Sequence, residues 1–305
     1  MGRGHDRLKL VYSAEVAAAR RTLKPLVALE TSVLAQGLPY PHNVEAAKRC
    51  EAAVRDEGAI PAPMAVIDGQ LFVGLDAAQT RLLVTGKNLM KIGSRDLSIA
   101  VARKATGGTT VSATCEMAAE AGIFVFATGG IGGVHHGDQF DISQDLAAIA
   151  RFPVAVVCAG AKSVLDLERT LELLETLAVP VVGIGTRELP GFYTRETGLT
   201  LEHQVDDPSE AAEMIRARRD LKQGGMVFTL PPPQKTALKQ AEVEKHVKAA
   251  LALAKKKKIE GKAVTPFLLS EMVERTKGKT LAANLALLEN NARYAAKIAV
   301  AFGWR

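Results

Sequence analysis

Short apolar runs alternate with longer amphipathic stretches along most of the chain. The apolar runs include PLVALE, GIFVFATGG, FPVAVVCAG and GGMVFTL, and the stretches between them include NVEAAKRCEAAVRDEG and SVLDLERTLELLETLA. Strands that are apolar throughout are buried on both faces, as in parallel sheets that helices cover. The pattern therefore predicts an α/β fold with a largely parallel sheet flanked by helices on both faces.

One apolar region breaks this alternation. In AVIDGQLFVGL, Asp68 and Gly69 stand between two apolar runs, and this pair is the usual sequence of a type I′ hairpin turn. A two-residue hairpin joins antiparallel strands. We therefore expect a mixed sheet, with an antiparallel excursion near residues 64–74.

The character of the chain changes after the three prolines at 231–233, which end the last predicted strand. Thr265 before Pro266 is a typical helix start, with threonine as the N-cap and proline at the first helical position. The sequence shows no repeat and no low-complexity linker, so we predict a single α/β domain over residues 21–305, after an N-terminal extension over residues 1–20. Its C-terminal layer is helical, with patterns that fill residues 235–258, 266–276 and 280–301.

Charge and cysteine content limit the kinds of binding partner and the cellular compartment that we expect for this chain. The net charge is +6, but four lysines form one run at 255–258, at the end of a predicted helix, where the helix dipole favours cations. We interpret this run as a solvated helix end and expect no nucleic-acid partner.

The three cysteines show no CxxC spacing, which indicates neither a disulfide framework nor a zinc site and fits a cytoplasmic location. No apolar run approaches the roughly 20 residues that span a bilayer, so no membrane association is expected.

Polar residues follow four of the apolar runs. They are Glu30-Thr31-Ser32, Thr128-Gly129-Gly130, Lys162-Ser163 and Thr186-Arg187. In open α/β sheets, ligands bind beyond the carboxyl ends of the strands. These four groups are therefore candidates for one site.

Lys162 and Glu30 carry the most specific chemistry of the four groups. Ser163 and Asp166 have the spacing of a capping box, which would place Lys162 just before a helix N-terminus, where a neutral and nucleophilic amine is favoured. The alternative is a phosphate-binding or solvent-facing lysine. Glu30 follows an apolar strand, so it is a candidate proton donor. Its alternative role is to cap the turn that follows.

The segment ATGGIGGVHHGDQFDISQDL gathers glycines, histidines and aspartates in a way that is unusual for a core. Its GGxGG spacing lets the backbone approach a ligand closely but does not match a dinucleotide fingerprint. Asp138, Asp141 and Asp145 offer the hard oxygen atoms that Mg²⁺ and Mn²⁺ prefer. Two alternatives stay open: Asp141 and Gln144 have capping-box spacing, and the two histidines could serve only hydrogen bonds within the loop.

A phosphate site is indicated by KIGSRDL and the later GGTTVSAT. Lys91 and Arg95 supply positive charge. A helix that begins in a Thr/Ser-rich turn presents backbone N–H groups, which favour phosphate. The alternative is that Ser112 only caps this helix.

Taken together, these motifs resemble the pseudouridine-5′-phosphate glycosidase family, also called the indigoidine synthase A-like family. The resemblance runs from about residue 26 to 295 and rests on stretches such as ALETSVLAQGLPYPHNVE, KIGSRDL, GGTTVSAT, VFATGGIGGVHHG, FDISQDL, VVCAGAKSVLDL, TPFLLSEM and NLALLENNA. It implies reversible cleavage of pseudouridine 5′-phosphate by water to uracil and ribose 5-phosphate. It also implies a homotrimer that depends on Mn²⁺, with one ion per subunit.

The resemblance further implies roles for particular residues. The lysine of CAGAKS is the family's nucleophile, which attacks C1′ and forms an imine with the opened sugar, and here it is Lys162. The proton donor in LETSV is here Glu30, and the metal-binding aspartate of FDIS is here Asp141. One basic residue expected in the family is replaced by Ser94. The implied substrate contacts are Lys91, Val111, Ser143, Gln144 and Asp145.

The chemistry of a carbon leaving group explains this set of residues. An imine at C1′ supplies an electron sink, and an acid must protonate the ring carbon that departs. One alternative is a Schiff-base aldolase or lyase that acts on another sugar phosphate and shares Lys162. A second is a basic nucleic-acid-binding protein, which the 5% aromatic content and the lack of an RNA-binding motif disfavour.

Overall fold

The computed structural model describes residues 9–137, 140–259 and 264–303. Within these ranges the strands form one sheet in the order β1-β4-β3-β2-β7-β8-β11-β9-β10, and β5 and β6 attach beside β3. Neighbouring strands run parallel except that β3 is antiparallel to β4 and β6, so the predicted mixed and largely parallel sheet is confirmed. The strands are β1 Leu10–Tyr12, β2 Leu26–Leu29, β3 Ile60–Ile67, β4 Gln70–Val73, β5 Met90–Ile92, β6 Gly107–Thr109, β7 Val125–Ala127, β8 Ala155–Cys158, β9 Val181–Ile184, β10 His203–Val205 and β11 Met226–Thr229.

The predicted hairpin joins β3 to β4. Asp68 and Gly69 form its turn with φ angles of 48° and 75°, the left-handed pair that a type I′ turn requires. A Cβ atom on Gly69 would lie 2.7 Å from the carbonyl oxygen of Val101, so this position also lacks room for a side chain. The antiparallel excursion is therefore confirmed at the predicted place.

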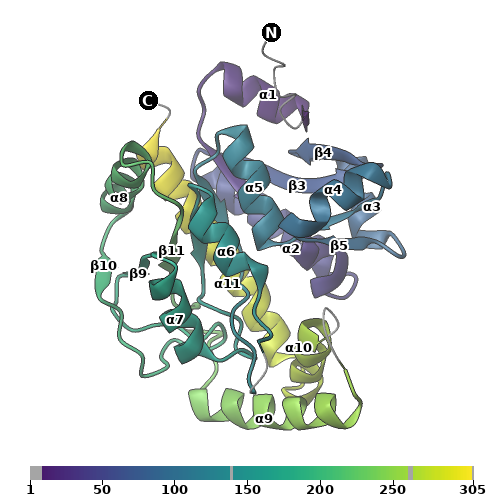
Figure 1. The fold of residues 1–305 in the computed structure, drawn as a ribbon, viewed down its shortest axis with the longest axis vertical. Coiled ribbons are helices and arrows are strands. Elements are labelled where there is room, and N and C mark those ends of the chain that lie inside the picture. Colours follow the sequence, from purple (N-terminus) through teal and green to yellow (C-terminus); the bar gives the residue numbers. More distant parts are fainter. Residues whose placement is uncertain (1–8, 138–139, 260–263, 304–305) are drawn as a thin grey trace.

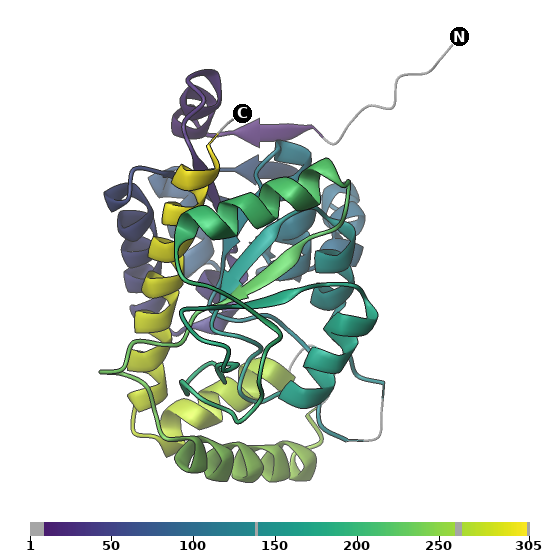
Figure 2. The same cartoon turned by 90° about the vertical axis from the view of Figure 1, so that its left-hand side faces the viewer.

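Helices cover both faces of the sheet. On one face α11 (Lys279–Phe302) packs against α2 (His42–Asp56) and α8 (Pro208–Asp220). On the other face lie α5 (Val111–Ala121), α6 (Gln144–Arg151) and α7 (Leu167–Thr176). Figure 2 shows the purple and yellow helices of the first face at the left and the blue-green helices of the second at the right. The remaining helices are α1 Ala14–Arg21, the π-helix η1 Val33–Gly37, α3 Ala77–Thr85, the 3-10 helix η2 Ser94–Asp96, α4 Leu97–Ala102, α9 Gln240–Lys256 and α10 Val264–Arg275.

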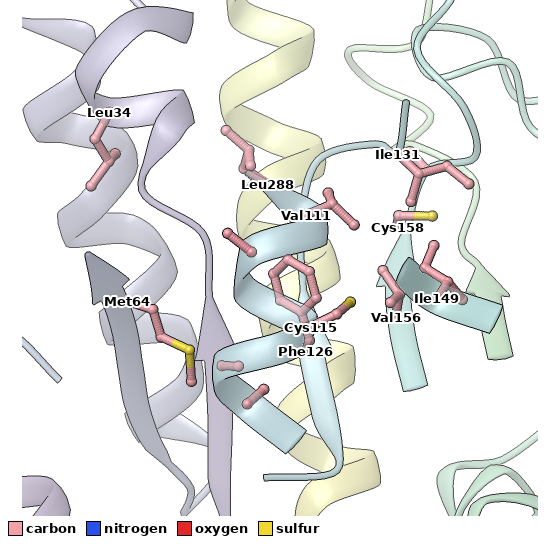
Figure 3. Close-up of a cluster of buried hydrophobic side chains, with 14 of the residues drawn as sticks. Leu34, Met64, Val111, Cys115, Phe126, Ile131, Ile149, Val156, Cys158 and Leu288 are labelled. Atoms are coloured by element: carbon pink, nitrogen blue, oxygen red, sulfur yellow. The ribbon is translucent and has the colours of Figure 1, made fainter. Parts of the chain in front are cut away.

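The two faces have separate cores because side chains alternate along each strand. In β2, Leu26 and Ala28 belong to the core under α5, whereas Val27 and Leu29 pack on the side of α2 and α11. Figure 3 shows the first core, where Cys115 of α5 lies beside Phe126 of β7. This double burial is what the fully apolar strands of the sequence predicted.

The C-terminal helical layer lies at the carboxyl end of the parallel strands. Figure 1 shows α9 and α10 at the lower end of the molecule and α11 running from there along the sheet. The predicted N-cap at Thr265 is wrong, because α10 already includes Val264. The side chain of Thr265 instead helps to line the cavity described below.

Part of the N-terminal extension belongs to the sheet. Residues 1–8 lie outside the described residues, but β1 pairs in parallel with β4 at the sheet edge. Ser13 then caps α1, since its Oγ accepts a hydrogen bond from the backbone N–H of Val16 at 3.3 Å. Within the described ranges, no helix combines the length and apolar character needed to cross a bilayer.

Candidate active site

A cavity of about 290 Å³ opens where the carboxyl ends of the central strands meet the C-terminal helices. Three of the four polar strand ends contribute to it. The fourth, Thr186-Arg187, does not line the cavity. Thr186 Oγ1 accepts a hydrogen bond from the N–H of Glu188 at 3.0 Å. Arg187 Nε donates to the carbonyl oxygen of Leu201 at 2.9 Å. The cavity brings together the eight residues to which the family resemblance gives roles: Glu30, Lys91, Val111, Asp141, Ser143, Gln144, Asp145 and Lys162.

Glu30 follows β2 and is buried, and both of its carboxylate oxygens accept a hydroxyl hydrogen bond. Ser32 Oγ donates to Oε2 at 2.6 Å, and Thr128 Oγ1 donates to Oε1. Thr128 is itself anchored from α11, because Asn291 Nδ2 donates to its carbonyl oxygen at 2.9 Å. Glu30 and Ser32 line the cavity, so this carboxyl group is both fixed and accessible to a ligand.

Lys162 lies in the loop between β8 and α7. Its backbone N–H donates to the carbonyl oxygen of Ile131 at 3.1 Å, which ties it to the glycine-rich loop. The predicted capping box is wrong: α7 begins at Leu167, and Asp166 alone is its N-cap, accepting from the N–H of Arg169 at 3.1 Å. Ser163 lies in a turn before the helix, so the helix dipole acts on Lys162 less directly than the sequence suggested.

Asp145 is buried and joins two separate backbone segments. Its Oδ1 accepts from the N–H of Ser112 at 3.0 Å, and its Oδ2 accepts from the N–H of Gly132 at 2.9 Å. Ser112 does not cap α5: Thr110 occupies that position and forms no side-chain cap. The carboxylate of Asp145 therefore satisfies the first turn of α5 from across the cavity.

Ser143, and not Asp141, is the N-cap of α6. Its Oγ accepts from the N–H of Asp145 at 3.2 Å. The neighbouring Gln144 reaches back to η2, where its Oε1 accepts from the N–H of Arg95 at 3.1 Å. The alternative role of Asp141 as a helix cap is thus excluded, which leaves its side chain at the rim of the cavity.

A positively charged corner lies beside the start of α5. Lys91 of β5 and Arg95 of η2 line the cavity there, together with Val111. Arg95 is also within 3.9 Å of Asp96 and its side chain is largely exposed. Two cationic side chains next to the first N–H groups of a helix suit a phosphate group.

His135 lines the cavity, and charged groups of the site affect its pKa. Burial lowers the pKa of His135 below its ordinary value, the negative charge of Asp141 opposes this, and the charges of His136, Lys162 and Lys91 add to it. The lowered pKa favours the neutral imidazole, which has one donor and one acceptor nitrogen. Its backbone N–H donates to the carbonyl oxygen of Asp141 at 3.0 Å, so the loop hydrogen bond expected from the sequence is also present.

The residues present could hold a Mn²⁺ ion only if the ion kept most of its water ligands. No group of three or more His, Cys, Asp or Glu side chains within the described ranges could hold a metal ion. Asp145 is engaged by two N–H groups, and Asp138 lies outside the described residues. Asp141 is exposed and lines the cavity. Hard divalent ions keep several waters and accept one or two carboxylates, so Asp141 suits the role of a single protein ligand.

Several residues that line the cavity were not assigned from the sequence. They include Asn284 and Leu288 of α11, four residues apart on one helix face, and Leu288 is also among the core side chains drawn in Figure 3. Phe192 has a φ of 65°, and a Cβ atom on Gly130 would lie 2.6 Å from its ring. The motifs TPFLLSEM and NLALLENNA contain lining residues at helical spacing, and this spacing is the sequence pattern that could have indicated them. The unassigned lining residues include Gln36, Gly37, Phe192, Thr265, Pro266, Leu269, Asn284 and Leu288.

Comparisons with known proteins agree over nearly the whole chain. The sequence model of the family described as "Indigoidine synthase A like protein" matches residues 15–301. The pseudouridine-5′-phosphate glycosidase of Myxococcus xanthus is 63% identical over 97% of this chain and 99% of its own length, and that of Staphylococcus aureus is 47% identical over 95% of each. Two crystal structures have a TM-score of 0.89 and cover 98% of both chains. They are an indigoidine synthase A-like protein from Thermotoga maritima at 34% identity and the prealnumycin C-glycosynthase in complex with ribulose 5-phosphate at 36%.

Proposed function

The chain belongs to the indigoidine synthase A-like protein family, and we propose that it is a pseudouridine-5′-phosphate glycosidase. The reaction is the reversible cleavage of the C–C glycosidic bond of pseudouridine 5′-phosphate by water to uracil and ribose 5-phosphate. One observation carries the proposal: a single cavity holds an amine, Lys162, and a buried carboxyl group, Glu30, beside a cationic corner for phosphate. Relatives of the same length, up to 63% identical, bear this name.

The proposed reaction begins with Lys162. Its Nζ bonds to C1′ of the sugar while the bond from C1′ to the ring oxygen breaks, and that oxygen takes up the proton that the amine releases. Glu30 then gives a proton to C5 of the uracil ring as the C1′–C5 bond breaks, and the nitrogen lone pair forms the C1′=N imine. Water hydrolyses the imine, which releases ribose 5-phosphate and returns a proton to Glu30.

The other predicted residues position the substrate in this proposal. Lys91, Arg95 and the N–H of Val111 bind the 5′-phosphate, and Ser143, Gln144 and Asp145 shape the loop that faces the sugar. Asp141 would hold Mn²⁺, which supplies positive charge to substrate oxygen atoms when it is bound. The family resemblance also supports a homotrimer, which sedimentation velocity tests, and the absence of a disulfide framework supports a cytoplasmic location.

Uracil release tests the proposed function. The purified chain with Mn²⁺ should release uracil from pseudouridine 5′-phosphate but not from uridine 5′-phosphate, whose base leaves through nitrogen. Unphosphorylated pseudouridine should have a kcat/KM lower by about 10² to 10⁴, because two charge-assisted contacts contribute roughly 1.5 to 3 kcal/mol each. Equal turnover of pseudouridine 5′-phosphate and pseudouridine would contradict the proposed phosphate site. If neither compound released uracil, the proposed function would be refuted.

A further inference from the structure

The side chain of Gln144 contacts a different element from the one that carries it. Gln144 is the first residue of α6, and its Oε1 accepts a hydrogen bond from the backbone N–H of Arg95 in η2 at 3.1 Å. The first N–H groups of a helical turn have no partner within that turn, so this bond satisfies one of them from 49 residues away in the chain. The mechanism above gives this contact no task.

The amide of Gln144 lies against Gly93, in space that a larger residue at 93 would occupy. A Cβ atom on Gly93 would lie 2.7 Å from Cδ of Gln144 and closer still to Nε2. The φ and ψ angles of Gly93 are −94° and 175°, an extended conformation that any residue adopts, so the backbone does not require glycine here. Glycine at this position instead gives Gln144 room to reach the N–H of Arg95.

Hydrogen bonds from the start of α6 also reach the other part of the cationic corner. Asp145, the next residue, accepts from the N–H of Ser112 in the first turn of α5 at 3.0 Å. Ser112 Oγ in turn accepts from the N–H of Ser94 in η2 at 3.2 Å. These bonds join η2, α5 and α6 beside the cavity, and the bond from Gln144 is made to Arg95, a cationic residue that lines it.

We propose that the side chain of Gln144 is a positioning residue for the 5′-phosphate, because it holds the backbone of Arg95 where the guanidinium can reach that group. The inference rests on the proposed function and deepens it, since it assigns part of the phosphate preference to a residue that acts through Arg95. The side chain of Arg95 is largely exposed and keeps rotamer freedom, so the place of its backbone decides which oxygen atoms it can reach. Loss of such a contact weakens substrate binding and raises KM rather than lowering kcat.

The phosphate preference measures this contact. It is the ratio of kcat/KM for pseudouridine 5′-phosphate to kcat/KM for unphosphorylated pseudouridine. Gln144→Met keeps the length of the side chain but has no amide oxygen, so the ratio should fall roughly 3- to 10-fold, the usual effect of one hydrogen bond, through a higher KM for the phosphate. Gly93→Ala displaces the amide without straining the backbone and should cause a fall of similar size. Gln70→Met, at the exposed start of β4, is the matched control and should keep the wild-type ratio.

Combined variants show whether Gln144 acts through Arg95. Gln144→Met should lower the ratio no further in a protein that already carries Arg95→Ala, because both changes remove the same contact to phosphate. Gly93→Ala should cause no further fall when added to Gln144→Ala, which leaves no amide to displace. A merely structural role would lower both kcat/KM values together, so a wild-type ratio in Gln144→Met would overturn the inference. Effects of Gln144→Met and Arg95→Ala that multiply would overturn it too.

Ribose 5-phosphate separates this inference from the proposed function. Its Kd, measured by isothermal titration calorimetry, should rise in Gln144→Met by the same factor as KM, because the compound carries the phosphate but no base. An equal Kd in wild type and Gln144→Met would overturn the inference, while uracil release by wild type would still support the function. If wild type releases no uracil, the proposed function fails, and the two Kd values still decide the role of Gln144.

Discussion

At the scale of single residues, the hydroxyl groups around Glu30 suit a group that changes its protonation state. Ser32 and Thr128 each contact one carboxyl oxygen, and a hydroxyl can donate to a carboxylate or accept from a carboxylic acid. The same surroundings can therefore hold Glu30 before and after it gives up a proton. The anchor of Thr128 to Asn291 keeps this arrangement in place.

The variant Glu30→Gln tests the proposed proton donor. It preserves the shape of the side chain but has no acidic proton, so uracil release should fall by about 10² to 10⁴, the usual range for general acid catalysis. Imine formation with ribose 5-phosphate should be less affected, because that compound has no uracil carbon to protonate. Uracil release near the wild-type rate would make Glu30 a structural turn residue, and loss of both activities in a folded protein would assign it to ring opening.

The variant Asp141→Ala tests the proposed metal ligand. Asp141 is the exposed carboxylate at the rim of the cavity that no helix uses as a cap, so its loss should raise the Mn²⁺ concentration needed for half-maximal activity by tenfold or more. Asp206→Ala, on the exposed loop after β10, is the control and should leave this concentration unchanged. A titration in which both variants match wild type would contradict the assignment.

At the scale of secondary-structure elements, Asp145 links the start of α5 to the glycine-rich loop. Asp145→Asn keeps one acceptor oxygen but turns an N–H₂ group toward a backbone N–H, which costs about 1 to 3 kcal/mol at a buried site. Thermal unfolding should show a Tm lower by several degrees. Asp207→Asn is the matched control, because Asp207 caps α8 at the exposed surface and asparagine is an equally good N-cap. Equal Tm values for the two variants would mean that Asp145 does not stabilise this junction.

The same element shows why helix starts were harder to predict than helices. The sequence offered Ser112 as a cap for α5, but the group that satisfies its first turn is Asp145, which is 33 residues away in the chain. Ser163 and Asp166 had capping-box spacing, yet only Asp166 is used, because the chain makes one more turn before α7. A cap depends on local backbone conformation and on distant partners, whereas the apolar pattern of a helix depends only on its own residues.

At the scale of the whole molecule, the layered fold and the meeting of the eight candidate residues at one cavity could be predicted, and the lining contributed by the C-terminal helices could not. The parallel strands place Glu30 and Lys162 at one sheet edge, as the apolar runs indicated. Asn284 and Leu269 lie in two of the family motifs, but they reach the site only through the packing of α10 and α11 across the strand ends. Gln36 lines the cavity from a π-helical turn, and the sequence did not predict this turn.

In the proposed reaction Lys162 forms a covalent imine with the sugar, and this adduct can be detected directly. The direct measurement is peptide mass spectrometry after borohydride reduction in the presence of pseudouridine 5′-phosphate and Mn²⁺. The peptide that contains Lys162 should gain the mass of a reduced ribose 5-phosphate adduct, and Lys162→Ala should gain none while the control Lys104→Ala, on an exposed turn, labels like wild type. Equal labelling of wild type and Lys162→Ala, or an adduct on another lysine while uracil is released, would contradict the claim.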